Sequence, residues 1–310
     1  MLFRSYYRNY TSDIPFKNGD GLYKAYVKAT DKAGITSENL GTFVNKIDTT
    51  SPVLGTVSIP AFAQDGINKA EKENLSETPF TLSVSVSDVS SKVKQFKVYR
   101  DSTEITENVA VSPAVSAADG IYADGEYVFT VSENSIGTTG KYKFSITAVD
   151  FAGNEATVSS STVTVDLDEP VISSFNEKQN AVEIDGVNYW NGIITVTGNV
   201  SDDELTAGEN GIVSWALYTK SGENYTPLSG NGTSGSTKLN GSGTVTNAVF
   251  SFTIDTTLAD STENGGDYYL KVSVKDKCGN VSQTAYTLLK IRQSTDKPEI
   301  SFSNANPSLL

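Results

Sequence analysis

One fourteen-residue stretch occurs three times in the chain, at residues 21–34, 140–153 and 266–279. Each copy opens with Gly-x-Tyr, places three apolar residues at every second position, and ends with Asp, a spacer, a small residue and Gly. The two-residue period predicts a β-strand with one buried face. The closing Asp and Gly are typical of a tight hairpin turn. Because a second β-rich run follows each turn, the repeated unit is predicted to be a β-hairpin.

Further alternating runs lie between the hairpins and predict the remaining strands. They cover residues 53–59, 80–88, 93–99, 127–131, 171–175, 193–200, 212–218 and 250–254. An Asp-Gly-Ile-Asn motif at 65–68 and an Asp-Gly-Val-Asn motif at 185–188 follow the first strand of their intervals, and we predict that they are equivalent. The one helical pattern is a short segment at 68–75.

Short segments that combine an acidic residue with proline follow the hairpins. Pro52, Pro170 and Pro298 are 118 and 128 residues apart, which is about the length of one sandwich domain. Such segments are typical of short, stiff joints. Because the first hairpin lacks an upstream half, we interpret the chain as a piece of a longer array. The predicted parts are the end of a domain at 1–50, complete domains at 51–168 and 169–297, and the start of a further domain or a tail at 298–310.

Composition excludes several classes of function. The net charge is −13 without a basic stripe, which argues against nucleic-acid binding. The chain has no His and one cysteine, Cys278, so it offers no disulfide framework, no Ser-His-Asp or Cys-His catalysis and no ordinary zinc site. The adjacent carboxylates at 202–204 lack the fixed separation of a glycosidase pair. We therefore predict that the chain is not an enzyme, and no segment is apolar enough to span a membrane.

Together, the alternating strands, the Asp-Gly-x-Asn motifs, the Asp-x-Ala-Gly-Asn turn at 150–154 and the proline joints resemble bacterial Ig-like (BIg-type) tandem repeats. The first hairpin departs from the pattern, because Ile35 replaces the Asn of the turn. The resemblance implies an all-β fold of tandem immunoglobulin-like β-sandwich domains in an elongated array, a monomeric rod. It also implies an extracellular or cell-surface bacterial protein and a role as a structural or adhesive stalk segment. Several branches of that family bind calcium at the joints.

The Ig-like fold also predicts which aromatic residues enter the core. Trp215 stands where Phe96 stands one domain earlier, the usual position of an Ig core tryptophan. We expect both side chains to be buried. Tyr142 and Tyr268 open two of the hairpins, and we expect their hydroxyls to bond to nearby backbone in a tyrosine corner.

The same topology brings carboxylates from a joint, from the loop after the second strand and from the hairpin turn to one end of each complete domain. The candidates are Asp48, Asp88 and Asp150 in the first domain, and Asp166, Asp168, Asp202, Asp203 and Asp276 in the second. Calcium takes about six to eight oxygen ligands and needs neither His nor Cys, so it is the predicted cofactor. The alternative is that each Asp caps its own turn by hydrogen bonds to the backbone.

Two other roles remain open for the same fold. One is a binding module that engages a surface glycan or a protein of a host or another cell, through loops or an exposed strand edge. Tyr189 and Trp190 could then stack on a sugar ring, although the ordinary interpretation is packing inside the protein. The other role is an accessory domain of a secreted polysaccharide-active enzyme, with catalysis elsewhere.

Overall fold

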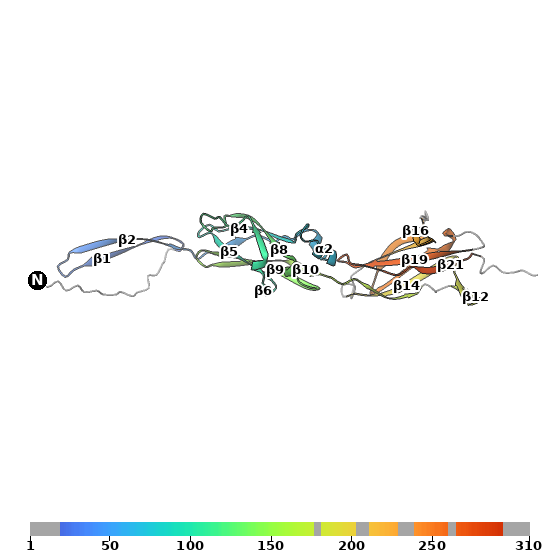
Figure 1. The fold of residues 1–310 in the computed structure, drawn as a ribbon. Helices are drawn as coiled ribbons and strands as arrows, with labels where there is room; N and C mark the ends of the chain where they lie inside the picture. Colours follow the sequence, from blue (N-terminus) through green and yellow to red (C-terminus); the bar gives the residue numbers. More distant parts are fainter. Residues whose placement is uncertain (1–18, 177–180, 203–210, 229–238, 260–264, 294–310) are drawn as a thin grey trace, which may run out of the picture. The chain divides into compact units, whose positions relative to one another are not determined.

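The computed structural model describes residues 19–176, 181–202, 211–228, 239–259 and 265–293. Strands dominate these residues, so the fold is all-β (Figure 1). The chain divides into two compact units: unit 1 combines residues 1–60, 79–135 and 142–162, and unit 2 combines residues 61–78, 136–141 and 163–310. No helix in the described ranges is long and apolar enough to cross a membrane.

The first two copies of the repeat form hairpins, as predicted. β1 (Gly21–Thr30) pairs antiparallel with β2 (Thr36–Ile47), and β9 (Gly140–Asp150) lies next to β10 (Glu155–Val165). The other elements from this part of the chain are β3 (Val53–Leu54), β4 (Thr81–Ser87), β5 (Val93–Arg100), β6 (Thr103–Glu104), η1 (Thr106–Asn108), β7 (Val109–Ser112), β8 (Gly125–Val131) and α3 (Glu133–Ile136).

Besides the hairpin β1–β2, unit 1 is built on two four-stranded sheets, ordered β3-β4-β8-β7 and β10-β9-β5-β6, although the end of β10 belongs to unit 2. Their inner faces carry alternate residues of each strand, as the two-residue period predicts. Phe96 of β5 is buried as expected, and its ring centroid lies 5.1 Å from those of Tyr127 and Phe129 of β8. These contacts join the two sheets face to face, which is the packing of a β-sandwich.

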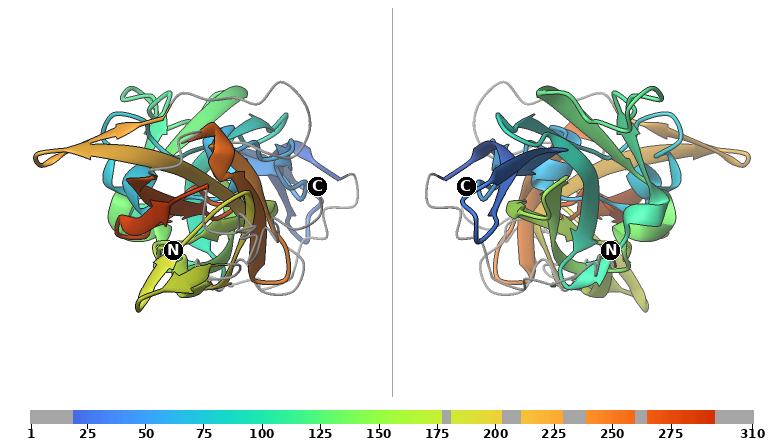
Figure 2. Two further views of the ribbon diagram at one scale, coloured as in Figure 1. Left: turned by 90° about the vertical axis from the view of Figure 1, so that its right-hand side faces the viewer. Right: turned by 90° about the vertical axis from the view of Figure 1, so that its left-hand side faces the viewer.

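Unit 2 carries the third hairpin. β19 (Gly266–Lys275) pairs with β20 (Val281–Gln283) and β21 (Thr287–Ile291). The sheet β16-β15-β19-β20 also takes in β17 and β21, and a second sheet has the order β11-β14-β18. The β15–β16 hairpin, coloured yellow to orange, extends from its sheet (Figure 2). The remaining elements are α1 (Phe62–Asp65), α2 (Lys69–Glu73), β11 (Val171–Asn176), β12 (Val182–Ile184), β13 (Val187–Tyr189), β14 (Ile193–Ser201), β15 (Gly211–Ser221), β16 (Asn224–Pro227), β17 (Asn240–Val245), β18 (Val249–Asp255) and η2 (Thr256–Leu258).

Trp215 of β15 packs against the core of unit 2, in the predicted role, although it stays partly accessible. Its ring stacks on Phe252 with centroids 4.2 Å apart and planes 7° from parallel. Gly241 lies beside the ring, where an added Cβ would approach Trp215 to 2.7 Å. The absence of a side chain at Gly241 therefore leaves the space that the indole fills.

The tyrosine corner forms at Tyr268, whose hydroxyl donates to the carbonyl of Ala259 at 2.9 Å. At the equivalent position in unit 1, the Tyr142 ring lies 5.1 Å from the Arg100 guanidinium. Tyr127, which the sequence reasoning did not single out, donates its hydroxyl to the carbonyl of Ala123 at 2.7 Å.

The variant Tyr268→Phe is expected to lower the free energy of unfolding of unit 2 by about 1 kcal/mol, because the Ala259 carbonyl loses its donor while the ring is kept. Chemical denaturation measures this, with Tyr269→Phe on the same strand as the control. Equal losses in the two variants would show that the corner bond adds nothing specific.

The predicted equivalence of residues 65–68 with residues 185–188 is wrong by three positions. Ile67 forms a parallel bridge with Val165, and the residue that bridges Ile291 in the same way is Trp190, not Val187. Asp185 and Gly186 instead form a turn between β12 and β13, both with positive φ (52° and 76°), as an Asp-Gly hairpin turn requires. Trp190 is buried, so it packs within unit 2 and offers no face to a sugar.

Candidate metal centres

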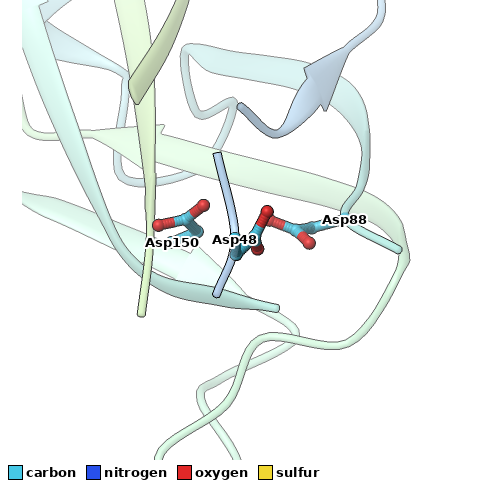
Figure 3. A group of neighbouring side chains, drawn as sticks. All are labelled: Asp48, Asp88 and Asp150. Atoms are coloured by element: carbon cyan, nitrogen blue, oxygen red, sulfur yellow. The ribbon is translucent and has the colours of Figure 1, made fainter. Parts of the chain in front are cut away.

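Three of the predicted carboxylates meet at one end of unit 1 (Figure 3). Asp48 follows β2, Asp88 follows β4, and Asp150 ends β9. One oxygen from each lies within 4.8 Å of the others, and all three side chains are buried. Carboxylates this close repel one another when ionised, so the group needs a positive charge or a proton among them.

Each carboxylate also caps its own turn, as the alternative interpretation predicts. Asp88 accepts hydrogen bonds from the backbone N–H groups of Ser90 and Ser91 at 2.8 and 3.0 Å, and Asp48 accepts one from Thr50 at 3.0 Å. Asp150 accepts from the backbone and side-chain amides of Asn154, both at 2.8 Å. Burial opposes ionisation of Asp150, but the bonds from Asn154 outweigh it and lower the pKa of this carboxyl.

Capping leaves two oxygens of the group unexplained. Oδ2 of Asp48 and Oδ2 of Asp88 are buried and accept no hydrogen bond from any residue that the structure describes. These side chains are only 8% and 4% exposed. An unsatisfied buried carboxylate oxygen is destabilising, and a bound cation or an ordered water compensates for it.

The position of Asp48 is set by a clamp that the sequence reasoning missed. Asp20, directly before β1, accepts hydrogen bonds from the backbone and the hydroxyl of Thr49, each at 2.8 Å, and from the Thr50 hydroxyl. The hydrogen bonds from Thr50 and Thr49 lower the pKa of the Asp20 carboxyl. Asn154 completes the clamp, since its side-chain amide donates to the Asp48 carbonyl at 3.1 Å.

A second group of the same design lies in unit 2. Oxygens of Asp166, Asp202 and Asp276 lie within 4.8 Å of one another. Asn280 repeats the part of Asn154: its amide donates to the Asp166 carbonyl at 3.0 Å and to Oδ2 of Asp276 at 2.8 Å. The two groups therefore use carboxylates from the same three kinds of position, after a hairpin, after an inner strand and at a hairpin turn.

Two further candidates do not join this group. Asp168 is exposed, and its carboxylate accepts from the Thr139 hydroxyl at 2.9 Å. Thr139 also accepts from the backbone of Leu167 at 3.2 Å, so it clamps the residues after β10 as Asp20 clamps those after β2. Asp203 lies outside the described residues.

The donor set of both groups consists of carboxylate oxygens, without nitrogen or sulfur ligands. Hard cations take such oxygens, and calcium accepts the irregular geometry that loops and turns provide, whereas magnesium requires a near-ideal octahedron. Among hard divalent cations, the residues present therefore fit calcium best.

Comparisons with known proteins do not identify the chain. No family model matches it, and no curated protein matches it. Among solved structures, it is similar to a crystal structure of BcpA, the major pilin subunit of Bacillus cereus, with 13% sequence identity over 87% of this chain and 75% of that chain. The TM-score is 0.21, so this likeness supports no argument about function.

Proposed function

We propose that this chain is a structural or adhesive stalk segment of a bacterial extracellular or cell-surface protein, built from tandem Ig-like sandwiches with calcium at the joints. The observation that carries the proposal is the buried carboxylate group of unit 1, in which Asp48 and Asp88 each keep one oxygen without a partner among the residues that the structure describes. The second group repeats its design.

The position of the ion explains why it would serve a stalk. Calcium held by Asp48, Asp88 and Asp150 would fix the residues after β2 on unit 1, and calcium held by Asp166, Asp202 and Asp276 would fix the residues after β10 on unit 2. Restraint of the residues between successive domains reduces the flexibility of a linker, which a spacer needs to hold another module at a distance.

The proposed extracellular location fits the same chemistry. Extracellular modules bind calcium with dissociation constants of about 10⁻⁴–10⁻³ M, which suits millimolar calcium outside the cell. The net charge of −13 also favours association with cations. The proposal includes no enzymatic activity, because the chain has no His and its one cysteine is buried at a turn.

Titration calorimetry of chelator-treated protein with calcium tests the proposal. We expect binding in the range of about 10⁻⁴–10⁻³ M, weakened by Asp88→Asn at the first group only, because that variant removes one charged ligand. Asp166→Asn should act at the second group only. Asp119→Asn, on an exposed loop of unit 1, is the matched control for loss of one negative charge. Absence of binding at about 10 mM calcium would refute the calcium site, and an equal effect of Asp119→Asn would reduce it to general charge attraction.

A further inference from the structure

Two hairpin turns of the chain have the same internal structure. In residues 150–154 and in residues 276–280 the backbone N–H of the Asp donates to the Asn carbonyl, at 3.1 and 3.0 Å. The Asn backbone donates back to the Asp carboxylate at 2.8 and 2.9 Å. In both, the Asn amide also bonds the carbonyl of the Asp that follows a hairpin. The two turns therefore offer the same groups to their surroundings.

In unit 2 the turn at 276–280 is covered by residues 65–69, which belong to the same unit. The Asn68 side-chain amide donates to the carbonyl of Cys278 at 2.9 Å. The backbone N–H of Lys69 donates to Oδ1 of Asn280 at 3.3 Å. Under this cover Cys278 is only 5% exposed.

A glycine in the covering segment and a glycine in the turn permit the two to lie this close. A Cβ on Gly66 would lie 2.3 Å from Sγ of Cys278, and a Cβ on Gly279 would lie 2.8 Å from the Asn68 amide nitrogen. Asn68 is held in place because it caps α2: its side chain accepts from the backbone of Glu71, and the Glu71 carboxylate accepts from the Asn68 backbone. The covering loop is thus a rigid Gly-x-Asn element.

In unit 1 the matching turn has no such cover among the described residues. Phe151 is 48% exposed, Ala152 and Gly153 are also exposed, and a Cβ on Gly153 would meet nothing within 4 Å. Val89, which follows Asp88 at the same end of the unit, is 94% exposed. The end of unit 1 that carries this turn therefore leaves the apolar side chains of Val89 and Phe151 exposed.

We propose that residues 151–154, together with Val89, form a docking surface for a β-sandwich of the same kind, which presents a Gly-x-Asn loop like residues 66–68. The Asn amide of that loop donates to the Ala152 carbonyl, and the next backbone N–H donates to Oδ1 of Asn154. The glycine lies over Ala152, the counterpart of Cys278. This inference goes beyond the calcium site, because it needs no bound ion.

The rate at which a thiol is chemically modified measures how accessible each of the two turns is. In the native chain the single cysteine reports on the covered turn, and Asn68→Ala should speed its modification about fivefold, the equivalent of one lost hydrogen bond of about 1 kcal/mol. The accessibility of the turn at 150–154 is measured in the full chain that carries Ala152→Cys and Cys278→Ala. The introduced thiol should react faster than Cys278 does in the native chain, and circular dichroism checks that the variant is folded.

The probe is a synthetic peptide of residues 61–78. We expect it to slow modification at position 152, by half when its concentration equals its dissociation constant and further above it. A peptide with Asn68→Ala is the matched control and should protect less, and one with Gly66→Val should not protect. A rate unchanged up to about 10 mM peptide, a contact worth less than about 3 kcal/mol, would overturn the proposal. Protection by the Asn68→Ala and Gly66→Val peptides equal to that by the native peptide would also overturn it, by showing nonspecific association.

Discussion

The variant Trp215→Ala is expected to lower the free energy of unfolding of unit 2 by about 3–5 kcal/mol. The indole stacks on Phe252 and fills the space beside Gly241, where an added Cβ would approach it to 2.7 Å. Its removal leaves a cavity between β15, β17 and β18 in addition to the lost burial of apolar surface. Chemical denaturation followed by far-UV circular dichroism measures the change.

Ile212→Ala is the control for this variant, because Ile212 lies on the same strand with its side chain 47% exposed. It should cost less than about 1 kcal/mol. Similar losses in the two variants would mean that the strand, and not the indole, determines stability. A loss below about 1 kcal/mol for Trp215→Ala would place the indole outside the core.

Calcium should stabilise the folded protein by about 2.7 kcal/mol per site when the free ion is 100-fold above its dissociation constant, because the unfolded chain hardly binds it. The melting temperature should rise accordingly, and chelator should reverse the rise. In small-angle scattering, calcium should narrow the distribution of particle dimensions, since the residues after each hairpin become fixed.

The variant Asp88→Asn tests whether Asp88 is a metal ligand or only a turn cap. With calcium, the variant should lose the stabilisation at the first group and keep that at the second, because the groups share no residue. With chelator, it should be as stable as the native chain or more so, because one of three mutually repelling carboxylates is gone. If it is destabilised equally with and without calcium, Asp88 serves as a turn cap alone.

The hairpins could be predicted because their signals are local. The alternation of apolar residues and the Asp and Gly of each turn act within a few residues, and the structure confirms the strands and turns that they predicted. The all-β fold follows from the same period. The local nature of these signals also explains why the predicted equivalence of residues 65–68 and 185–188 was wrong. An Asp-Gly pair suits several turns, and its register against β21 depends on the burial of Trp190.

The residue types also predicted which carboxylates could reach one end of a sandwich, but not which of two neighbours would do so. Asp166 and Asp168 are equally acidic and lie two residues apart. Asp166 enters the group because its backbone N–H bonds to the Ile67 carbonyl at 2.9 Å, whereas Asp168 bonds to Thr139. Hydrogen-bond partners far away in the sequence therefore determine which of the two aspartates enters the group.

By itself, the sequence determined the strands, the turns and the oxygen-only chemistry of the sites, because each depends on residue type and short spacing. Two features were decided by tertiary structure alone, within the described part of the chain. Asp48 and Asp88 each keep an oxygen without a partner, and the turn at 276–280 is covered while the turn at 150–154 is not. The two turns differ little in sequence. What differs is the distant segment that packs on them, and burial of a polar group is a property of that packing.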